Sequence, residues 1–517
     1  MGELYDLVIH NIGELVTPRT CVAHGGGAQV KPAIYADLYG SGAMGGQSQG
    51  SAFTGNVALG GEGQGDVLHL KDAWVAVKDG LIAEVGSGAG SAPDAAKRRD
   101  GGGRLATPGL VDPHTHLVFA GWRERELGDK LRGVPYLDIL AAGGGILSTV
   151  RATRAATEME LTDHVVPILE HMMGHGVTTC EVKSGYGLTC RDEMKQLNVI
   201  KELASFYPLE LVPTLMAAHA IPSEYKDDRE GYVRLVIDEI IPAVAQNGLA
   251  EFCDVFCERG VFTVEESERI LRAGLAAGLA PKCHCDEIEA IGGTEMAAGL
   301  GAVSCEHLIC CTQTGIEALA ESQRKSQRKS SAEASAGASA EVSSQASTKS
   351  SAEVPVQDST KASAEEPTMA SMKASAEASA RVRKNPGTIA CLLPATSFYL
   401  DAPFAPAREL MSAGVPVAIG SDFNPGSCPV DSLLLAMQIG CYKYRMTPEE
   451  TLTAVTQNAA AALGRGGRTG SLEAGKQADI VLWDAPNLDY IFYRFGANLV
   501  QSVYKKGDLV AETENGW

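Results

Sequence analysis

The sequence predicts an α/β protein: a (β/α)8 TIM-like barrel with a small composite β-sandwich formed by the two ends of the chain. Segments with helical periodicity, such as Arg191–Leu203 and Thr263–Leu275, alternate with apolar runs of strand length. Eight near-continuous hydrophobic strands that alternate with helices indicate a closed parallel barrel. We expect the barrel over 108–465 and the sandwich over 1–107 and 466–517. The eight strand runs are 109–116, 177–183, 211–219, 252–258, 280–285, 302–307, 388–394 and 416–422.

Two segments look foreign to a compact fold. Residues 22–66 are rich in glycine and poor in large apolar side chains, which predicts a flexible loop. Residues 323–386 consist largely of Ser, Ala, Glu and Lys with no apolar face, so we expect a disordered low-complexity insert. The seventh strand run starts 86 residues after the sixth, and this interval falls to 22 without the 64-residue insert. The insert is therefore expected between the sixth helix and the seventh strand, away from the catalytic end of the barrel.

Both ends of the chain carry short strand patterns. Asp72–Val85 predicts two strands joined by a turn at Asp79-Gly80. Ala478–Trp483 and Val500–Val510 show similar patterns near the C-terminus. We expect these sequence-distant strands to meet in the composite sandwich.

The composition argues against some classes of binding partner and against a secreted or membrane-spanning protein. A formal net charge of −20 argues against nucleic acid or an anionic membrane, since both require basic surfaces. No apolar run approaches the roughly 20 residues of a transmembrane helix, and the first residues lack the pattern of a secretory signal. The thirteen cysteines form no Cys-x-x-Cys pair, which favours reduced, buried thiols. We therefore expect a cytoplasmic protein.

The strongest functional signal is a group of histidines and one aspartate at the ends of predicted strands. His114 and His116 close the first strand, and residues i and i+2 of a strand point to the same side, so both imidazoles can reach one ion. His284 ends the fifth strand and Asp422 ends the eighth. Nitrogen and oxygen ligands from three separated strands suit a divalent metal with room left for water. This pattern predicts a metal-dependent hydrolase, because bound metal makes water acidic enough to lose a proton near neutral pH.

Two residues near these ligands suggest further chemistry. Glu287, three residues past His284, could transfer a proton without binding the metal, or it could be a solvated charge that opens the next helix. The end of the fourth strand, Asp254–Glu258, carries no carboxylate-bridging lysine, so we expect one metal ion rather than two. Arg123 lies in the first loop after a barrel strand, where its guanidinium would suit the carboxylate of a small anionic substrate.

The remaining polar groups also follow predicted strands. His219 ends the third strand and His307 the sixth, while Tyr186 follows the second. A single histidine at a strand end is usually structural, but five at one face of a barrel favour a functional site. The loop at 422–427 offers Asn424, backbone N–H groups and a serine hydroxyl, which suit a polar or anionic group.

Six strings of residues resemble the imidazolonepropionases, a family of the amidohydrolase superfamily that acts in histidine degradation. The resemblance covers nearly the whole barrel and both sandwich ends and leaves out the two inserts. His-x-His marks only the superfamily, whereas Lys-Ser-Gly-Tyr-Gly-Leu and Asp-Phe-Asn-Pro-Gly are much more specific. The six strings are His114–Arg123, Gly143–Arg154, Glu181–Leu188, Ala218–Pro222, Lys282–Glu287 and Gly420–Ser427.

The resemblance implies a reaction and its residues. The expected reaction is hydrolytic ring opening of 4-imidazolone-5-propanoate to N-formimidoyl-L-glutamate, by a homodimer with one divalent or trivalent zinc or iron ion per chain. Water activated by the metal attacks the ring carbonyl, Glu287 acts as acid and base, Asp422 accepts a proton, and His307 stabilises the developing oxyanion. The implied metal ligands are His114, His116, His284 and Asp422. The implied substrate contacts are Arg123, Tyr186, His219, Glu287, Asn424, Gly426 and Ser427.

Some positions depart from the family pattern, and two other functions stay open. Trp122, Cys283, Cys285 and Ala395 replace residues more usual in the family, and only Ala395 puts a loop geometry in doubt.

A nucleobase deaminase of the same superfamily would share the His-x-x-Glu pattern, but nucleobases lack the carboxylate that Arg123 suits. A catalytically inactive barrel that serves as an interaction scaffold is disfavoured by the complete set of ligand candidates.

Overall fold

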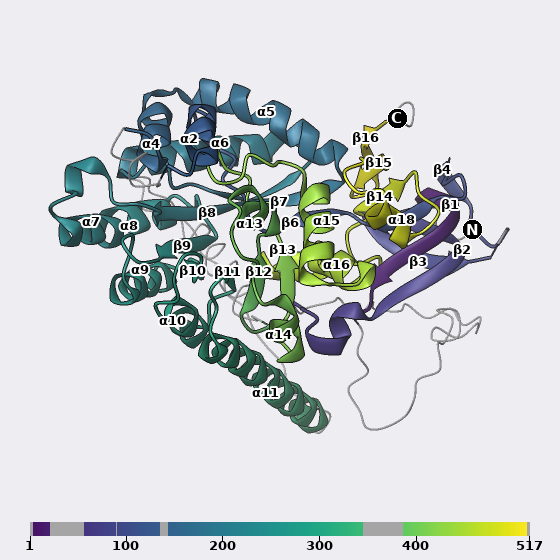
Figure 1. Ribbon diagram of the computed structural model, residues 1–517. Coiled ribbons are helices and arrows are strands. Elements are labelled where there is room, and N and C mark those ends of the chain that lie inside the picture. The colour runs from purple at the N-terminus through teal and green to yellow at the C-terminus, as the bar shows by residue number, and fades with distance from the viewer. Residues whose placement is uncertain (1–3, 21–55, 89, 135–142, 345–385, 514–517) are drawn as a thin grey trace, which may run out of the picture.

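The computed structural model describes residues 4–20, 56–88, 90–134, 143–344 and 386–513, without the side chains of 330–344. Eight parallel strands lie in the order β13-β12-β11-β10-β9-β8-β7-β6, which confirms the predicted barrel (Figure 1). Each strand coincides with one predicted apolar run, and β7 and β10 have the predicted bounds. The strands are β6 (Leu110–Asp112), β7 (Val177–Lys183), β8 (Glu210–Ala218), β9 (Phe252–Cys257), β10 (Ala280–Cys285), β11 (Ser304–His307), β12 (Ile389–Leu392) and β13 (Val417–Ile419).

The first and last strands meet just beyond their regular ends. Thr115 forms a parallel bridge with Phe423, and the backbone N–H of Asp422 donates to the carbonyl of His114 at 3.0 Å. The expected strand 109–116 is too long, since β6 ends at Asp112. Pro113 follows and has no N–H for a ladder. The bridge at Thr115 still keeps the two-residue alternation that points His114 and His116 the same way.

Helices surround the barrel, and the predicted helices 191–203 and 263–275 are confirmed as α6 and α9. Thr263 starts α9 with a capping box, in which its side chain and that of Glu266 bond each other's backbone N–H. The helices are α2 (Leu127–Leu131), α4 (Ile146–Ala155), α5 (Glu158–Gly174), α6 (Cys190–Phe206), α7 (Arg229–Leu235), α8 (Ile241–Gln246), α9 (Val264–Ala276), α10 (Gly293–Leu300), α11 (Gln313–Ser344), α13 (Pro394–Tyr399), α14 (Ala407–Ser412), α15 (Leu433–Tyr444), α16 (Pro448–Ala454), α17 (Gln457–Ala462) and α18 (Leu488–Tyr493). Short turns are the 3-10 segments η1 (Gly61–Gly65), η2 (Glu124–Glu126) and η3 (Ser223–Tyr225), and the π segment η4 (Val236–Ile240).

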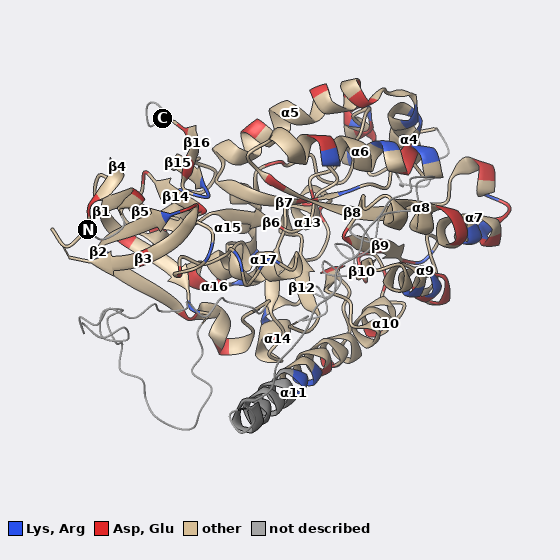
Figure 2. Ribbon diagram, turned by 180° about the vertical axis from the view of Figure 1, so that it is seen from behind, with Lys and Arg blue, Asp and Glu red and all other residues tan. Residues whose placement is uncertain are grey.

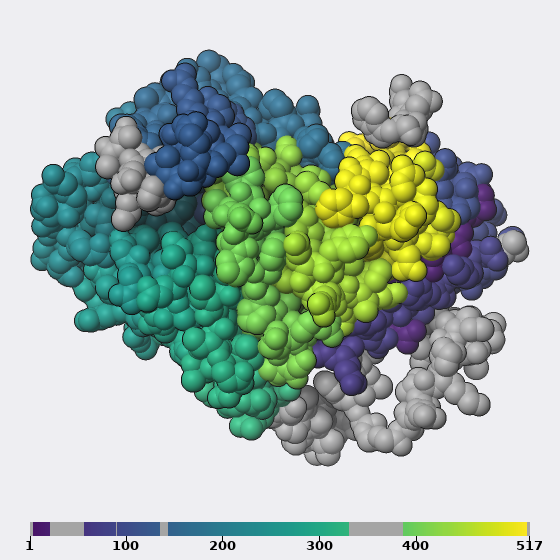
Figure 3. Space-filling view, viewed as in Figure 1, coloured from purple at the N-terminus to yellow at the C-terminus, as the bar shows by residue number. Residues whose placement is uncertain are grey.

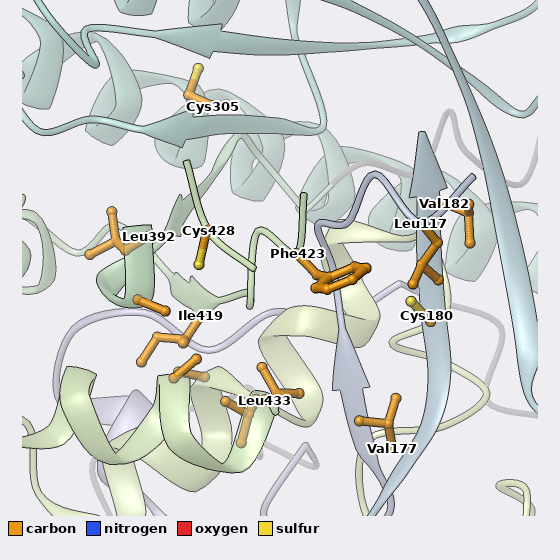
Figure 4. Close-up of a cluster of buried hydrophobic side chains, with 14 of the residues drawn as sticks. Leu117, Val177, Cys180, Val182, Cys305, Leu392, Ile419, Phe423, Cys428 and Leu433 are labelled. Carbon is orange, nitrogen blue, oxygen red and sulfur yellow. The ribbon is translucent and has the colours of Figure 1, made fainter. Parts of the chain in front are cut away.

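The core lies between the barrel strands and this helical layer. Figure 4 shows Phe423, Leu117 and Leu433 within one buried cluster, next to side chains of β7. The two cysteines that flank His284 belong to the same large core and are fully buried, as expected for packing residues on the outer side of a barrel strand. On the outside, acidic and basic side chains mix on α7 and α9 (Figure 2), and Arg269 pairs with Glu230 at 2.7 Å.

The predicted joint β structure of the two chain ends is confirmed as one mixed sheet in the order β16-β15-β14-β5-β1-β2-β3, with β4 on β1. Figures 1 and 3 show the C-terminal strands (yellow) against the N-terminal ones (purple). Asp79 and Gly80 both have positive φ, which is the type I′ turn expected for the β2–β3 hairpin. The strands are β1 (Tyr5–Pro18), β2 (Val67–Lys78), β3 (Leu81–Ser87), β4 (Ala95–Asp100), β5 (Leu105–Pro108), β14 (Ile480–Trp483), β15 (Val500–Lys505) and β16 (Asp508–Glu512).

The described ends of both expected inserts, 56–66 and 323–344, are ordered. Residues 56–66 of the predicted loop 22–66 pack against the barrel, because the Gln64 amide exchanges two 3.0 Å hydrogen bonds with the backbone of Val417. Helix α11 continues through the first part of the predicted insert 323–386, as far as Ser344. The rest of each segment, 22–55 and 345–385, lies outside the described residues. Among the described helices, none combines the length and apolar character needed to cross a membrane.

Candidate active site

The four predicted ligands converge at the carboxyl ends of the barrel strands. One oxygen of Asp422 lies 3.3 Å from Nε2 of His114 and 3.8 Å from Nε2 of His116. The His284 ring centre lies 4.6 Å from that of His114 and 5.5 Å from that of His116. All four side chains are buried. His114, His116 and Asp422 offer donor atoms within 4.8 Å of one another, a spacing that one metal ion could span, and His284 forms a second such group with His114 and His307.

Two nitrogen donors of this cluster have no other partner among the described residues. Nε2 of His114 and Nε2 of His284 are buried and have no hydrogen-bond partner among the described residues. Buried polar atoms are normally satisfied, so unsatisfied nitrogens on two neighbouring rings fit a site for a cation. The second oxygen of Asp422 accepts a 2.5 Å hydrogen bond from Thr396, which fixes the carboxylate.

Two residues of the site adopt a strained backbone. His307 and Asp422 have φ of 71° and 54°, in the left-handed region that non-glycine residues rarely occupy. Such conformations persist where the surroundings hold them and cluster at functional sites. Burial opposes ionisation of Asp422, but the contact with His114 outweighs it and holds the pKa of this carboxyl well below its usual range.

Glu287 and His307 form a second pair beside the cluster. Nε2 of His307 lies 3.6 Å from Oε2 of Glu287. Burial, aided by the nearby charge of Asp422, raises the pKa of Glu287 to about 8, so this carboxyl can hold a proton at neutral pH. Burial lowers the pKa of His307 to about 3, which keeps its imidazole neutral. A protonated carboxyl next to a neutral imidazole suits general acid and base catalysis.

His219 and Tyr186 complete one wall of the site. The His219 ring stacks on His116 with centres 5.0 Å apart, and its Nδ1 lies 3.1 Å from the carbonyl oxygen of Gly185. Burial lowers the pKa of His219 to about 3. If Nδ1 donates to Gly185, Nε2 is left as the acceptor that faces the site. The Tyr186 ring is buried and lies 5.3 Å from the His219 ring.

Arg123 lines a cavity of about 900 Å³ that opens beside the first barrel loop. Its guanidinium rests against Gly426 so closely that a Cβ at Gly426 would lie 1.3 Å from Nη2. Nε of Arg123 is buried without a hydrogen-bond partner among the described residues. Lys130 donates to the carbonyl of Gly426 at 2.7 Å, which anchors the same loop. An arginine with an unsatisfied N–H that packs against the loop following Asp422 suits a carboxylate ligand.

Asn424 shapes the loop that carries Gly426. Its Oδ1 accepts from the backbone N–H groups of Gly426 at 2.9 Å and Ser427 at 2.7 Å, and from the Ser427 hydroxyl at 3.0 Å. Its Nδ2 donates to the backbone carbonyl of Asp422 at 2.8 Å. In this structure the Asn424 amide therefore holds the loop, and its predicted contact with substrate stays a prediction, as does that of Ser427.

Sequence reasoning missed a layer of charged residues beneath the cluster. Five fully buried side chains on four adjacent or nearby strands form it: Glu181, Lys183, Asp254, Lys282 and Glu306. The signal for them was present, since charged residues at alternate positions of a buried strand, such as 181 and 183, must face the barrel interior.

Comparisons with known proteins agree with this architecture. Residues 105–510 match the model of the amidohydrolase family. The chain is 46% identical over 448 residues to an imidazolonepropionase of Alkaliphilus metalliredigens strain QYMF, which covers 86% of this chain and 91% of that protein. It is 42% identical over 450 residues to an imidazolonepropionase of Streptococcus pyogenes serotype M6, with the same two coverages.

Solved structures share the fold at low sequence identity. An adenosine deaminase of Xanthomonas campestris with bound zinc superposes with a TM-score of 0.59 at 17% identity, covering 98% of this chain and 93% of that one. An atrazine chlorohydrolase of Arthrobacter aurescens TC1 complexed with zinc gives a TM-score of 0.58 at 14% identity, covering 99% and 96%. These similarities concern the fold alone.

Proposed function

Since this chain belongs to the amidohydrolase family, and within it to the imidazolonepropionases, we propose that it hydrolyses 4-imidazolone-5-propanoate to N-formimidoyl-L-glutamate. The observation that carries this proposal is the pairing of two features in one site. One is the cluster of imidazoles with Asp422; the other is Arg123, whose buried Nε has no hydrogen-bond partner among the described residues and whose guanidinium packs against Gly426, four residues past Asp422. A metal-assisted hydrolase that places a guanidinium at this position suits a ring substrate with a carboxylate tail.

We further propose that one zinc or iron ion is held by His114, His116, His284 and Asp422. Three nitrogens and one oxygen suit a borderline metal with a position left for water or substrate. When bound, the metal supplies a Lewis acid that polarises the ring carbonyl and lowers the pKa of water.

The side chains then divide the remaining work. Arg123 binds the propionate and so orients the ring toward the cluster. Glu287 holds a proton at neutral pH and delivers it to the ring nitrogen as the C–N bond breaks. Asp422 takes up the proton released by the attacking water, and the strained backbone at His307 aims its neutral imidazole at the oxygen where negative charge develops. Tyr186 and His219 form the wall against which the ring lies.

The test is an assay of ring opening with purified protein, together with metal analysis. We expect hydrolysis of imidazolonepropionate, one equivalent of metal per chain, and no deamination of cytosine or guanine under the same conditions. Deamination without ring opening would refute the proposal in favour of a deaminase, and absence of both activities and of metal would favour a scaffold. The homodimer remains a prediction from the family resemblance, and the cytoplasmic location remains a prediction from the composition.

A further inference from the structure

Lys183 lies at the centre of the buried charged layer under the proposed metal ligands. Its ammonium contacts three carboxylates: Asp254 at 2.7 Å, Glu181 at 2.9 Å and Glu306 at 3.0 Å. All four side chains are fully buried. Carboxylates brought this close together without water repel one another strongly, so their charges need a cation among them.

Two of these carboxylates also contact the proposed metal ligands. Oδ2 of Asp254 lies 3.0 Å from Nδ1 of His284, and Oε2 of Glu306 lies 2.5 Å from Nδ1 of His114. In both cases the oxygen that meets the histidine is the same oxygen that meets Lys183. A carboxylate on Nδ1 fixes the tautomer and orientation of an imidazole, so that Nε2 is the atom available to a metal.

The same atoms outline a place for a cation. Asp254, His284 and Glu306 offer three donor atoms within 4.8 Å of one another, a group that could itself hold an ion. The Lys183 ammonium contacts two of the three, at 2.7 and 3.0 Å. The ammonium of Lys183 therefore supplies the positive charge that Asp254 and Glu306 require.

We propose that Lys183 is a positioning residue: it acts as a resident cation that holds Asp254 and Glu306 against His284 and His114 and thereby orients both imidazoles. This inference rests on the metal site proposed above. Lys183 acts on the proposed ligands through the two carboxylates, each of which contacts both its ammonium and an imidazole. Lys282 supports the layer from its other side, where it contacts Glu181 at 2.7 Å and Glu306 at 3.0 Å.

The experiment measures zinc affinity by competition with a chelator, on full-length folded protein and without substrate. Lys183→Met removes the charge at similar length, and we expect the dissociation constant for zinc to rise by about 10- to 100-fold. We also expect a changed visible absorption spectrum after substitution with cobalt, because the imidazoles no longer hold one orientation. Unchanged affinity and an unchanged cobalt spectrum would overturn the proposal.

Lys505→Met is the matched control. Lys505 is also a buried lysine that pairs with a buried carboxylate, Asp479 at 2.8 Å, but it belongs to the terminal sheet. This variant should lose stability and keep wild-type zinc affinity. An equal loss of zinc affinity in Lys505→Met would show a general effect of removing a buried lysine and would also overturn the proposal.

A second variant covers the case in which Lys183→Met does not fold. Asp254→Asn keeps the shape of the side chain and removes the charge that links Lys183 to His284, so zinc affinity should again fall. Wild-type affinity in Asp254→Asn would contradict the proposal. The outcome is separable from the proposed function, since wild-type protein that binds zinc but does not open the ring refutes only the latter.

Discussion

Gly426→Ala tests the link between loop geometry and substrate binding most directly. The new Cβ would lie 1.3 Å from Nη2 and 1.7 Å from Cζ of Arg123, so the guanidinium must leave its place. The displaced atoms are the end of a flexible side chain, and Gly426 does not have positive φ. The folded state should therefore accommodate alanine at little cost in stability, while the proposed carboxylate contact is lost.

The size of the effect follows from the contact that is lost. A hydrogen bond to a charged group contributes about 1.5–3 kcal/mol, which corresponds to roughly a 10- to 150-fold change in kcat/KM. We expect most of it in KM, because a contact to the propionate is present in both ground state and transition state. Steady-state kinetics of ring opening, with the melting temperature measured in parallel, gives both quantities.

Two comparisons make this test specific. Gly299→Ala, at an exposed position of α10 with open space around it, should leave KM unchanged. With a substrate whose carboxylate is replaced by a neutral amide, wild type and Gly426→Ala should have the same KM, since neither makes the charged contact. An unchanged KM for the natural substrate, or an equal penalty on the amide, would refute the role given to Arg123.

Four further outcomes are expected. Glu287→Gln should keep its metal and lose about 10²- to 10⁴-fold in kcat by steady-state assay. Metal-free Glu287→Gln should also become more stable relative to metal-free wild type as the pH rises from about 5 to about 8, as measured by the difference in melting temperature. The reason is that the folded-state pKa of Glu287 is raised to about 8, so the wild-type protein loses stability across that window. Removal of the metal by a chelator should abolish activity and lower the melting temperature, since zinc at a thousand times its Kd stabilises the fold by about 4 kcal/mol. Equal melting curves with and without chelator would exclude a tightly bound metal. Deletion of 325–385 with a short linker should keep activity. A deletion that starts at 323 should lower stability, because the Gln323 amide donates to the Thr388 carbonyl at 2.7 Å and brings the two ends together. Loss of soluble activity in the shorter deletion would contradict this expectation.

The barrel and its ligand candidates could be predicted because each rests on a local pattern. A continuous apolar run indicates a parallel strand that is buried on both faces, and the sequence has eight such runs. A polar residue at the carboxyl end of such a strand lies at the catalytic end of the barrel, because all eight strands run in the same direction. The convergence of Asp422 with His114 followed from strand order alone. The strain at His307 and the tight approach of Arg123 to Gly426 depend on distant backbone and leave no local signal.

The failures have physical causes. Residues 323–344 lack an apolar face, which predicted disorder, but alanine, glutamate, lysine and arginine favour helix. Helix α11 already starts in the core at Ile316 and Leu319, so the costly nucleation step is complete and the helix propagates. Residues 56–66 order because Gln64 binds the backbone of a barrel strand 353 residues away, a partner that no local pattern reveals.

The joint between the first and last barrel strands places Asp422 beside His114 and His116, and these residues are held together by main-chain hydrogen bonds across the joint. During synthesis the two histidines leave the ribosome some 300 residues before the aspartate. A chain that has not yet made β13 lacks one donor, and so does a chain whose barrel has opened along this joint. Metal capture should therefore occur only once the barrel is complete, and an ion bound there would link the two strands that close it.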